Sequence, residues 1–439
     1  YSNESRDWDN MTYAAPNLLV TRSGGNERGD GPAPGTQHWV NIAGNWVLST
    51  TTRQRDGGEF GFDCTRGVTI AKNILAVGAI EDIPGSYLNP ASVVMSSFSS
   101  WGPTDDGRIK PDVVANGVGL LSTDSPADNS YVSLSGTSMS APSVSGSISL
   151  LLQHHNNLYG NLNITAATMK GIVIHTADEA GPNPGPDYMF GWGLMNTARS
   201  ALLMDVNSQL GGNNLIRELT LNQGNVIQFQ VQSSGVEPLK ATISWTDPAG
   251  TPPRLMLNPP DIMLVNDLDI RIITPNTTTE MPWILSPASP SSAATKGDNI
   301  RDNVEQVLIQ NPVAGTYTVR ITHKGNLFDG RQNLSLILSG TTMQLPAAVT
   351  LIAPANNAAQ EITNPMLRWN KTPFAFSYHL QVARDSLFTN LFFERDGFLP
   401  TVIQLSNVDG NVKFFWRVRA NNSGGRGAWS QVFNFMSLP

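Results

Sequence analysis

The chain has 439 residues, of which 40% are hydrophobic and 14% charged, with a formal net charge of −7. This length suffices for two or three domains. The sequence has no run of 18 apolar residues and no Lys/Arg cluster, so we expect neither a membrane span nor a nucleic-acid partner. The single cysteine, Cys64, excludes an intrachain disulfide framework and is expected to be a small buried residue.

The first part of the chain alternates apolar segments with glycine-rich turns. Residues 17–21 predict a short strand followed by the turn Ser23-Gly24-Gly25-Asn26, and residues 71–79 predict a second, buried strand. Taken alone, the Gly-Gly-Asn turn is best explained as an ordinary loop. Its interpretation therefore depends on a second segment further along the chain.

That second segment is residues 135–145, Ser-Gly-Thr-Ser-Met-Ser-Ala-Pro-Ser-Val-Ser. Gly136 allows a tight backbone approach, and Ser138 stands at the start of a predicted helix whose free N–H groups favour negative charge. Pro142 suits the first helical turn. The expected apolar side of this helix comprises Val144, Ile148, Leu151 and Leu152. A plain helix cap would explain one Gly-Thr-Ser, but the whole run indicates a nucleophilic serine.

Residues 135–145 resemble the nucleophile segment of the subtilisin-like serine peptidases, the subtilases. Residues 96–103, 106–115 and 191–196 resemble the Ser-Ser-x-Gly-Pro, Lys-Pro-Asp-x-x-Ala and Gly-x-Gly-x-x-Asn segments of that family, in the same order. The resemblance covers about residues 1–205. It implies an α/β domain with a parallel sheet.

The resemblance also implies roles for individual residues. Ser138 would attack the peptide carbonyl and form an acyl-enzyme, while the Asn26 side chain and the Ser138 N–H would form the oxyanion hole. The substrate would be bound by the turn and the helix entrance, where Ser23, Gly24 and Gly25 form one wall of the S1 pocket beside Gly136 and Thr137. The expected substrates are proteins and peptides.

The catalytic acid and base are the missing parts of this pattern. In subtilisins the triad runs Asp, His, Ser, with the oxyanion Asn between His and Ser. None of the six histidines has the His-Gly-Thr context of the family. His154 and His155 lie roughly 25 Å along the helix from Ser138 at about 1.5 Å per residue, and His175 falls in a predicted core helix capped by Thr165.

We therefore expect the Asp and His to lie upstream of Tyr1, so that the peptidase domain in this chain is an incomplete fragment. The upstream segment is either lost or bound as a separate chain. The alternative is an inactive fragment or pseudo-peptidase that acts as a binding or structural protein through its β domains.

After about residue 205 the helical periodicity stops and short strands separated by turns predict a β-sandwich or jelly roll over 206–344. The predicted strands are residues 216–221, 226–231, 240–245, 269–273, 304–309, 316–322 and 334–338. This region resembles the jelly-roll domain of some long subtilases, members of which can bind calcium. The structural calcium would be held by Asp267, Asp269, Asp298 and Asp302; the alternative is that these residues cap turns.

Residues 345–439 form the last predicted domain. Residues 367–369, 378–382 and 414–420 alternate with period two, and the region resembles the fibronectin type III domains of secreted bacterial enzymes. Trp369 and Trp416 are expected in its core. The complete expectation is an incomplete α/β subtilisin-like domain followed by two all-β domains, in a serine endopeptidase that is secreted or displayed on the cell surface.

Overall fold

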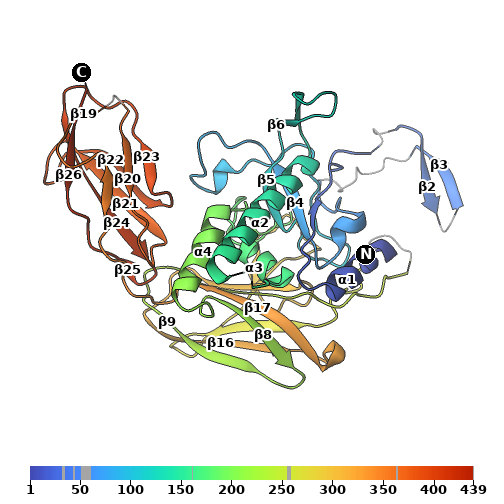
Figure 1. The fold of residues 1–439 in the computed structure, drawn as a ribbon. Coiled ribbons are helices and arrows are strands. Elements are labelled where there is room, and N and C mark those ends of the chain that lie inside the picture. Colours follow the sequence, from blue (N-terminus) through green and yellow to red (C-terminus); the bar gives the residue numbers. More distant parts are fainter. Residues whose placement is uncertain are drawn as a thin grey trace.

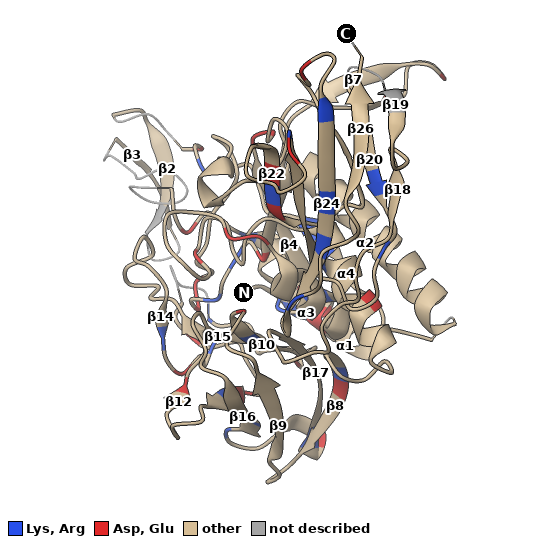
Figure 2. Cartoon of the chain, turned by 90° about the vertical axis from the view of Figure 1, so that its left-hand side faces the viewer, with Lys and Arg blue, Asp and Glu red and all other residues tan. Residues whose placement is uncertain are grey.

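The computed structural model describes residues 1–31, 35–42, 45–50, 61–160, 162–254, 259–361 and 364–438. Helices on a small parallel sheet lie above two antiparallel sheets, and a second all-β part forms one end of the molecule (Figure 1). Lys and Arg are interspersed with Asp and Glu over all of these parts (Figure 2). Within the described ranges, no helix has both the length and the apolar character that a membrane crossing requires.

The parallel sheet has the order β1-β4-β5, with β1 (Thr21–Ser23), β4 (Leu75–Ile80) and β5 (Val113–Asn116). Every residue of β4 is buried, as expected for a central strand covered on both faces. The strand predicted at 17–21 lies further along the chain, at Thr21–Ser23. The Leu18 N–H donates to Ala15 O (2.8 Å) and closes a turn where the strand was expected to begin. Helix α1 (Asn3–Ala14) precedes that turn.

Helix α2 (Thr137–Tyr159) packs on all three strands of this sheet. Val144, Ile148 and Leu151 are buried as predicted, but Leu152 is 41% exposed, because each residue turns the helix by about 100° and carries Leu152 off the buried side. Pro142 is the sixth helical residue rather than part of the first turn. Because proline has no backbone N–H, Pro142 donates no helical hydrogen bond to the carbonyl of Ser138, four residues earlier.

Helix α3 (Ala166–Thr176) is buried along its whole length. Thr165 caps it as predicted, since its hydroxyl oxygen accepts from the Thr168 N–H at 3.2 Å. His175 near its end is buried, with Thr242 Oγ1 and Ser339 Oγ each 2.9 Å from its ring nitrogens, so the expectation of a core histidine is confirmed. Helix α4 (Thr197–Gln209) follows and crosses the domain boundary placed at residue 205.

The second part is a sandwich of two four-stranded antiparallel sheets, with orders β15-β10-β17-β8 and β12-β11-β16-β9. All seven predicted strands are present, as β8 (Ile216–Asn222), β9 (Ile227–Ser233), β10 (Leu239–Ser244), β11 (Leu268–Ile273), β15 (Val304–Ile309), β16 (Gly315–His323) and β17 (Arg331–Ser339). Three strands of two residues each were not predicted, namely β12 (Thr279–Glu280), β13 (Trp283–Ile284) and β14 (Thr295–Lys296).

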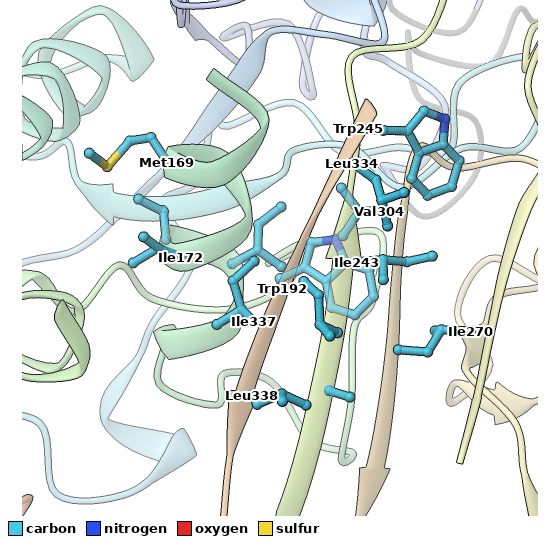
Figure 3. Packing of buried hydrophobic residues seen from close by; sticks show 14 of the residues in the cluster. Met169, Ile172, Trp192, Ile243, Trp245, Ile270, Val304, Leu334, Ile337 and Leu338 are labelled. Atoms are coloured by element: carbon cyan, nitrogen blue, oxygen red, sulfur yellow. The ribbon is translucent and has the colours of Figure 1, made fainter. Parts of the chain in front are cut away.

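The hydrophobic core runs without a break from the helices into this sandwich (Figure 3). Met169 and Ile172 of α3 and Trp192 belong to the same cluster of buried side chains as Ile243 and Ile337 of the sandwich. The α/β part and the sandwich therefore share one core, with α3 packed on β10 and β17.

The third part has its own core. One sheet has the order β18-β20-β23, and the other β19-β26-β24-β21-β22, with β25 paired to β24. The strands are β18 (Leu351–Ala353), β19 (Ala358–Glu361), β20 (Met366–Trp369), β21 (Ser377–Ala383), β22 (Leu391–Phe398), β23 (Val402–Gln404), β24 (Lys413–Asn422), β25 (Gly425–Arg426) and β26 (Phe433–Ser437). Trp369 and Trp416 are buried in this core, which confirms their predicted role.

Two hairpins and three 3-10 turns complete the described elements. The hairpins are β2 (His38–Ile42) with β3 (Asn45–Ser49), and β6 (Leu120–Thr123) with β7 (Tyr131–Leu134). The turns are η1 (Gly67–Ile70), η2 (Pro90–Ser92) and η3 (Phe328–Gly330). The β2–β3 hairpin extends away from the α/β part in the views of Figures 1 and 2.

Candidate active site

The turn after β1 is held against the start of α2, although the two lie 111 residues apart. Asn26 Oδ1 accepts hydrogen bonds from both the N–H and the hydroxyl of Thr137, each at 2.9 Å. The Thr137 hydroxyl oxygen also accepts from the Gly25 N–H at 3.1 Å. Thr137, which the family resemblance assigns to substrate binding, is the residue of the helix that holds the turn in place.

These bonds leave two donors beside Gly136. Because Asn26 Oδ1 is occupied by Thr137, its Nδ2 is the end of the amide that is available to a ligand. The Ser138 N–H lies in the first turn of α2, where backbone donors have no intrahelical acceptor, and no acceptor in the described chain pairs with it. A Cβ atom placed on Gly136 would lie 3.3 Å from Asn26 Nδ2 and 3.7 Å from Ser138 N. Both donors therefore border the same small space.

The side chain of Ser138 is exposed next to this space. Among the described residues, no partner forms a hydrogen bond with its hydroxyl, and no acidic residue lies in the first turn of α2 to offset the positive end of the helix. An exposed hydroxyl, two converging N–H donors and a helix N-terminus are parts of a site for acyl transfer to serine, which also needs a general base.

The glycines of the turn are required by close packing. Gly24 N donates to Val77 O at 2.7 Å, and a Cβ on Gly24 would approach that oxygen to 2.9 Å. Gly25 has φ +109°, and a Cβ there would lie 2.8 Å from Ser100 Oγ. The structure places Ser23 in the last position of β1, half-buried, just before these glycines.

Ser100 and Glu27 brace the turn from the other side and were not singled out from the sequence. Ser100 N donates to Gly25 O at 2.8 Å, and Ser100 Oγ lies 3.1 Å from both the N–H and a carboxylate oxygen of Glu27. Ser100 belongs to the Ser-Ser-Trp-Gly-Pro segment, so the motif itself carried the signal.

Residues 2–193 match the family model of the subtilases, peptidase family S8. The match identifies this part of the chain as a subtilase-like domain. The subtilase domain therefore contains the parallel sheet, the Asn26 turn and the helix that begins at Ser138.

Relatives match parts of the chain. The C5a peptidase of Streptococcus pyogenes is 52% identical over 68 residues, which cover 16% of this chain and 6% of that protein. The serine protease/ABC transporter B family protein tagD of Dictyostelium discoideum is 25% identical over 315 residues, covering 56% of this chain and 17% of that protein. The chain thus spans only a small share of the length of these relatives.

Solved structures are similar at lower levels. The patellamide maturation protease PatA is 20% identical with a TM-score of 0.31, over 47% of this chain and 57% of that one. A fibronectin type III-like protein from Clostridium thermocellum is 16% identical with a TM-score of 0.17, over 22% of this chain and 94% of that one. At these TM-scores the two likenesses add nothing to the assignment.

None of the six histidines of the chain contacts Ser138 of the subtilase domain. Each has a partner elsewhere: His38 with Thr36, His154 with Asp205, His155 with Tyr159, His175 with Thr242, His323 with Gly224 and His379 with Glu394. Burial, and next to it Lys240, lowers the pKa of His175 well below its usual range, so this histidine is a neutral core residue. The structure thus assigns no base to Ser138 from these side chains.

A buried network of charges supports the sheet of the subtilase domain. Asp112 accepts from Lys110 at 2.5 Å and from the Ala76 N–H at 2.7 Å, and Lys170 of α3 lies 3.0 Å away. Burial alone would raise the pKa of Asp112, but Lys110 and Lys170 lower it, so the carboxylate is charged. The Lys-Pro-Asp segment therefore ties β4, β5 and α3 together.

The four aspartates predicted to hold calcium do not form one site. Asp267, Asp269 and Asp298 surround the ammonium group of Lys324, whereas Asp302 lies apart and accepts from the Ile109 N–H at 2.8 Å. In the part of the chain that the structure describes, no group of three or more His, Cys, Asp or Glu side chains is arranged to hold a metal ion. Because Lys324 lies at the centre of the cluster, calcium could bind these residues only by displacing it, and the calcium assignment stays a prediction.

Proposed function

We propose that this protein is a serine endopeptidase in which Ser138 is the nucleophile. The observation that carries the proposal is the convergence of two donors, Asn26 Nδ2 and the Ser138 N–H, on the space beside Gly136. The match of residues 2–193 to the subtilase family model supports it.

In this proposal the Ser138 hydroxyl oxygen attacks the carbonyl carbon of a peptide bond. The carbonyl oxygen becomes negative and moves into the space between Asn26 Nδ2 and the Ser138 N–H, where both donate to it. The tetrahedral intermediate releases the amine of the peptide and leaves an acyl-enzyme, which water then hydrolyses.

The turn Ser23-Gly24-Gly25 is proposed as one wall of the S1 pocket. Its backbone is fixed by Val77 on one side and Thr137 on the other, which supports a preformed wall. The substrates are proposed to be proteins and peptides outside the cell.

The proton acceptor for Ser138 is proposed to come from another polypeptide segment, because the six histidines of this chain have their partners elsewhere. The exposure of Ser138 is compatible with such a contribution. A serine without a base is a weak nucleophile, so activity requires both pieces.

Labelling by a fluorophosphonate tests this proposal, because the reagent reacts with activated serines. The protein purified from its natural source is treated with the reagent, digested and analysed by mass spectrometry, alongside a Ser138→Ala variant. We expect one modified peptide that contains Ser138, and none in the variant. A native protein that stays unlabelled would contradict the proposal and favour a binding or structural role for the β domains.

A further inference from the structure

Three carboxylates of the sandwich share one ammonium group. Lys324 Nζ lies 3.1 Å from Asp267 Oδ2, 2.8 Å from Asp269 Oδ1 and 3.1 Å from Asp298 Oδ1. An ammonium has three N–H donors, so each carboxylate can receive one of them. The distance to Asp269 is that of a charge-assisted hydrogen bond, and the distances to Asp267 and Asp298 are slightly longer.

The strand register fixes Lys324 at this place. In the antiparallel pair β11–β16, Leu268 is opposite His323, which sets Asp267 beside Lys324. The Lys324 N–H donates to Asp267 O at 2.9 Å and anchors the backbone there. Asp298 joins from the loop between β14 and β15. The fold of the sandwich therefore fixes the position of Lys324 beside Asp267.

A second cation borders the same cluster. Arg271 contacts Asp269 at 2.8 Å and also pairs with Asp298, and its Nη1 lies 3.6 Å from Glu305 Oε2. Burial opposes the charge of Lys324, but Asp269 and Asp267 raise the pKa of this lysine above its usual range. Lys324 is thus cationic at any pH at which the carboxylates are ionised.

We propose that the ammonium group of Lys324 is the resident cation of this cluster, in the place where a divalent ion would otherwise bind, so that the sandwich does not take up calcium there. Calcium requires oxygen ligands at about 2.3–2.6 Å and would have to displace the ammonium from the same carboxylates. Lys324 and calcium therefore exclude one another.

Removal of Lys324 is expected to turn the cluster into a calcium site. Asp269 and Asp298 would then keep Arg271 as a cationic partner, whereas Asp267 would have none among the described residues. Glu305 supplies a further oxygen, since its Oε2 accepts from the Ile270 N–H at 2.7 Å and its buried Oε1 has no hydrogen-bond partner among the described residues. Carboxylate oxygens are ligands that calcium prefers, and water would have to supply the rest of its six to eight ligands.

Thermal unfolding of the full chain in excess EDTA and in millimolar CaCl2 tests the proposal. We expect the wild-type midpoint to be the same in both buffers. Lys324→Met should unfold several degrees lower in EDTA and regain stability in calcium, because a ligand that binds only the folded state stabilises it. The double variant Lys324→Met/Asp269→Asn should lose the calcium response, and Lys413→Met, on the exposed start of β24, should behave like wild type.

Calcium binding is measured in parallel by equilibrium dialysis, which remains informative if Lys324→Met does not fold. Wild type and the conservative variant Lys324→Arg should bind no calcium at this cluster. One bound calcium per wild-type chain that is lost in Asp269→Asn, or a folded Lys324→Met that neither loses stability in EDTA nor binds calcium, would overturn the proposal.

Discussion

At the scale of single residues, one substitution can separate the structural contact of Asn26 from its proposed function in the oxyanion hole. Its Oδ1 fastens the turn to Thr137, and its Nδ2 faces the space beside Gly136. The sequence motif predicted the proposed function, because the family pattern includes it. The structural contact could not be predicted, since the Thr137 contact depends on how closely β1 and α2 approach in space.

Asn26→Asp separates the structural contact from the proposed function. The carboxylate can still accept both hydrogen bonds from Thr137, but it brings an acceptor and a negative charge to the oxyanion position. We expect kcat to fall at least by the roughly 10²–10³-fold known for removal of one oxyanion-hole donor in a subtilisin. The thermal midpoint should stay close to that of wild type. Activity within a few-fold of wild type would contradict the role of Asn26.

Gly136→Ala tests the space itself. The added Cβ would lie 3.3 Å from Asn26 Nδ2, between the two donors, on a residue with φ +153°. We expect kcat/KM to fall by more than about tenfold, because a shift of about 1 Å in the position of a reacting group can lower the rate roughly 10²-fold. Gly29→Ala is the matched control, because nothing lies within 4 Å of a Cβ there. Equal activities of the two variants would argue against this location of the oxyanion hole.

The burial of Lys240 makes the free energy of unfolding depend on pH in the alkaline range. Burial lowers its pKa to about 8, and its ammonium donates to His175 O at 2.8 Å. The unfolded chain keeps the ordinary lysine pKa of about 10.4, so between these values it binds more protons than the folded protein, and the free energy of unfolding rises with pH. Below pH 8 this contribution is flat.

We expect the stability of wild type relative to Lys240→Met to increase by roughly 2 kcal/mol between pH 8 and pH 10. Urea unfolding of both proteins across this range measures the difference, in which the other titrating groups cancel. A difference that stays constant with pH would contradict the lowered pKa of Lys240.

At the scale of elements, α3 is the joint between the subtilase domain and the sandwich. A Cβ on Gly171 would lie 2.5 Å from Ile337 Cδ1 and 3.2 Å from Ser244 Cβ, so the helix rests directly on β17 and β10. Gly146 is also a helical glycine, in α2, but a Cβ there meets nothing within 4 Å.

The same substitution should therefore have opposite effects in the two helices. Gly146→Ala should stabilise the protein by up to about 1 kcal/mol through helix propensity. Gly171→Ala should destabilise it by about 1–3 kcal/mol, because overpacking of a close contact outweighs that gain. Thermal unfolding of both variants measures the sign. A gain in stability for Gly171→Ala would contradict the tight packing of α3.

Element type was predictable from the sequence wherever a periodic apolar pattern was long enough. The seven strands of the sandwich and the cap at Thr165 emerged from such local signals. The two-residue strands β12 to β14 were missed because so short a segment has no periodicity. The place of Lys324 among the predicted calcium ligands could not be predicted from the sequence. Lys324 is distant in sequence from Asp267 and Asp298, and only the β11–β16 register brings it among them.

At the scale of the whole molecule, the described residues form two large hydrophobic cores, one fewer than the three predicted domains, and two smaller clusters lie within the subtilase domain. The subtilase domain and the sandwich share one hydrophobic cluster, and Lys72 of the former pairs with Asp247 of the latter with both side chains fully buried. The third part has a separate core and meets the rest through contacts such as Lys371 with Asp205.

Calorimetry should therefore detect two unfolding transitions rather than three. The larger one should comprise the subtilase domain and the sandwich together, because neither can expose α3 without opening the shared core. Limited proteolysis between the transitions should release the region after residue 345. Separate transitions for the subtilase domain and the sandwich would contradict a common core.

The central claim, that Asn26 and Ser138 form one oxyanion site, is tested most directly by a crystal structure of the protein after reaction with a peptidyl phosphonate. We expect phosphorus bonded to Ser138 Oγ, and the phosphonyl oxygen within hydrogen-bond distance, about 3 Å, of both Asn26 Nδ2 and the Ser138 N–H. Phosphorus on another side chain, or a phosphonyl oxygen directed away from Asn26, would contradict the account.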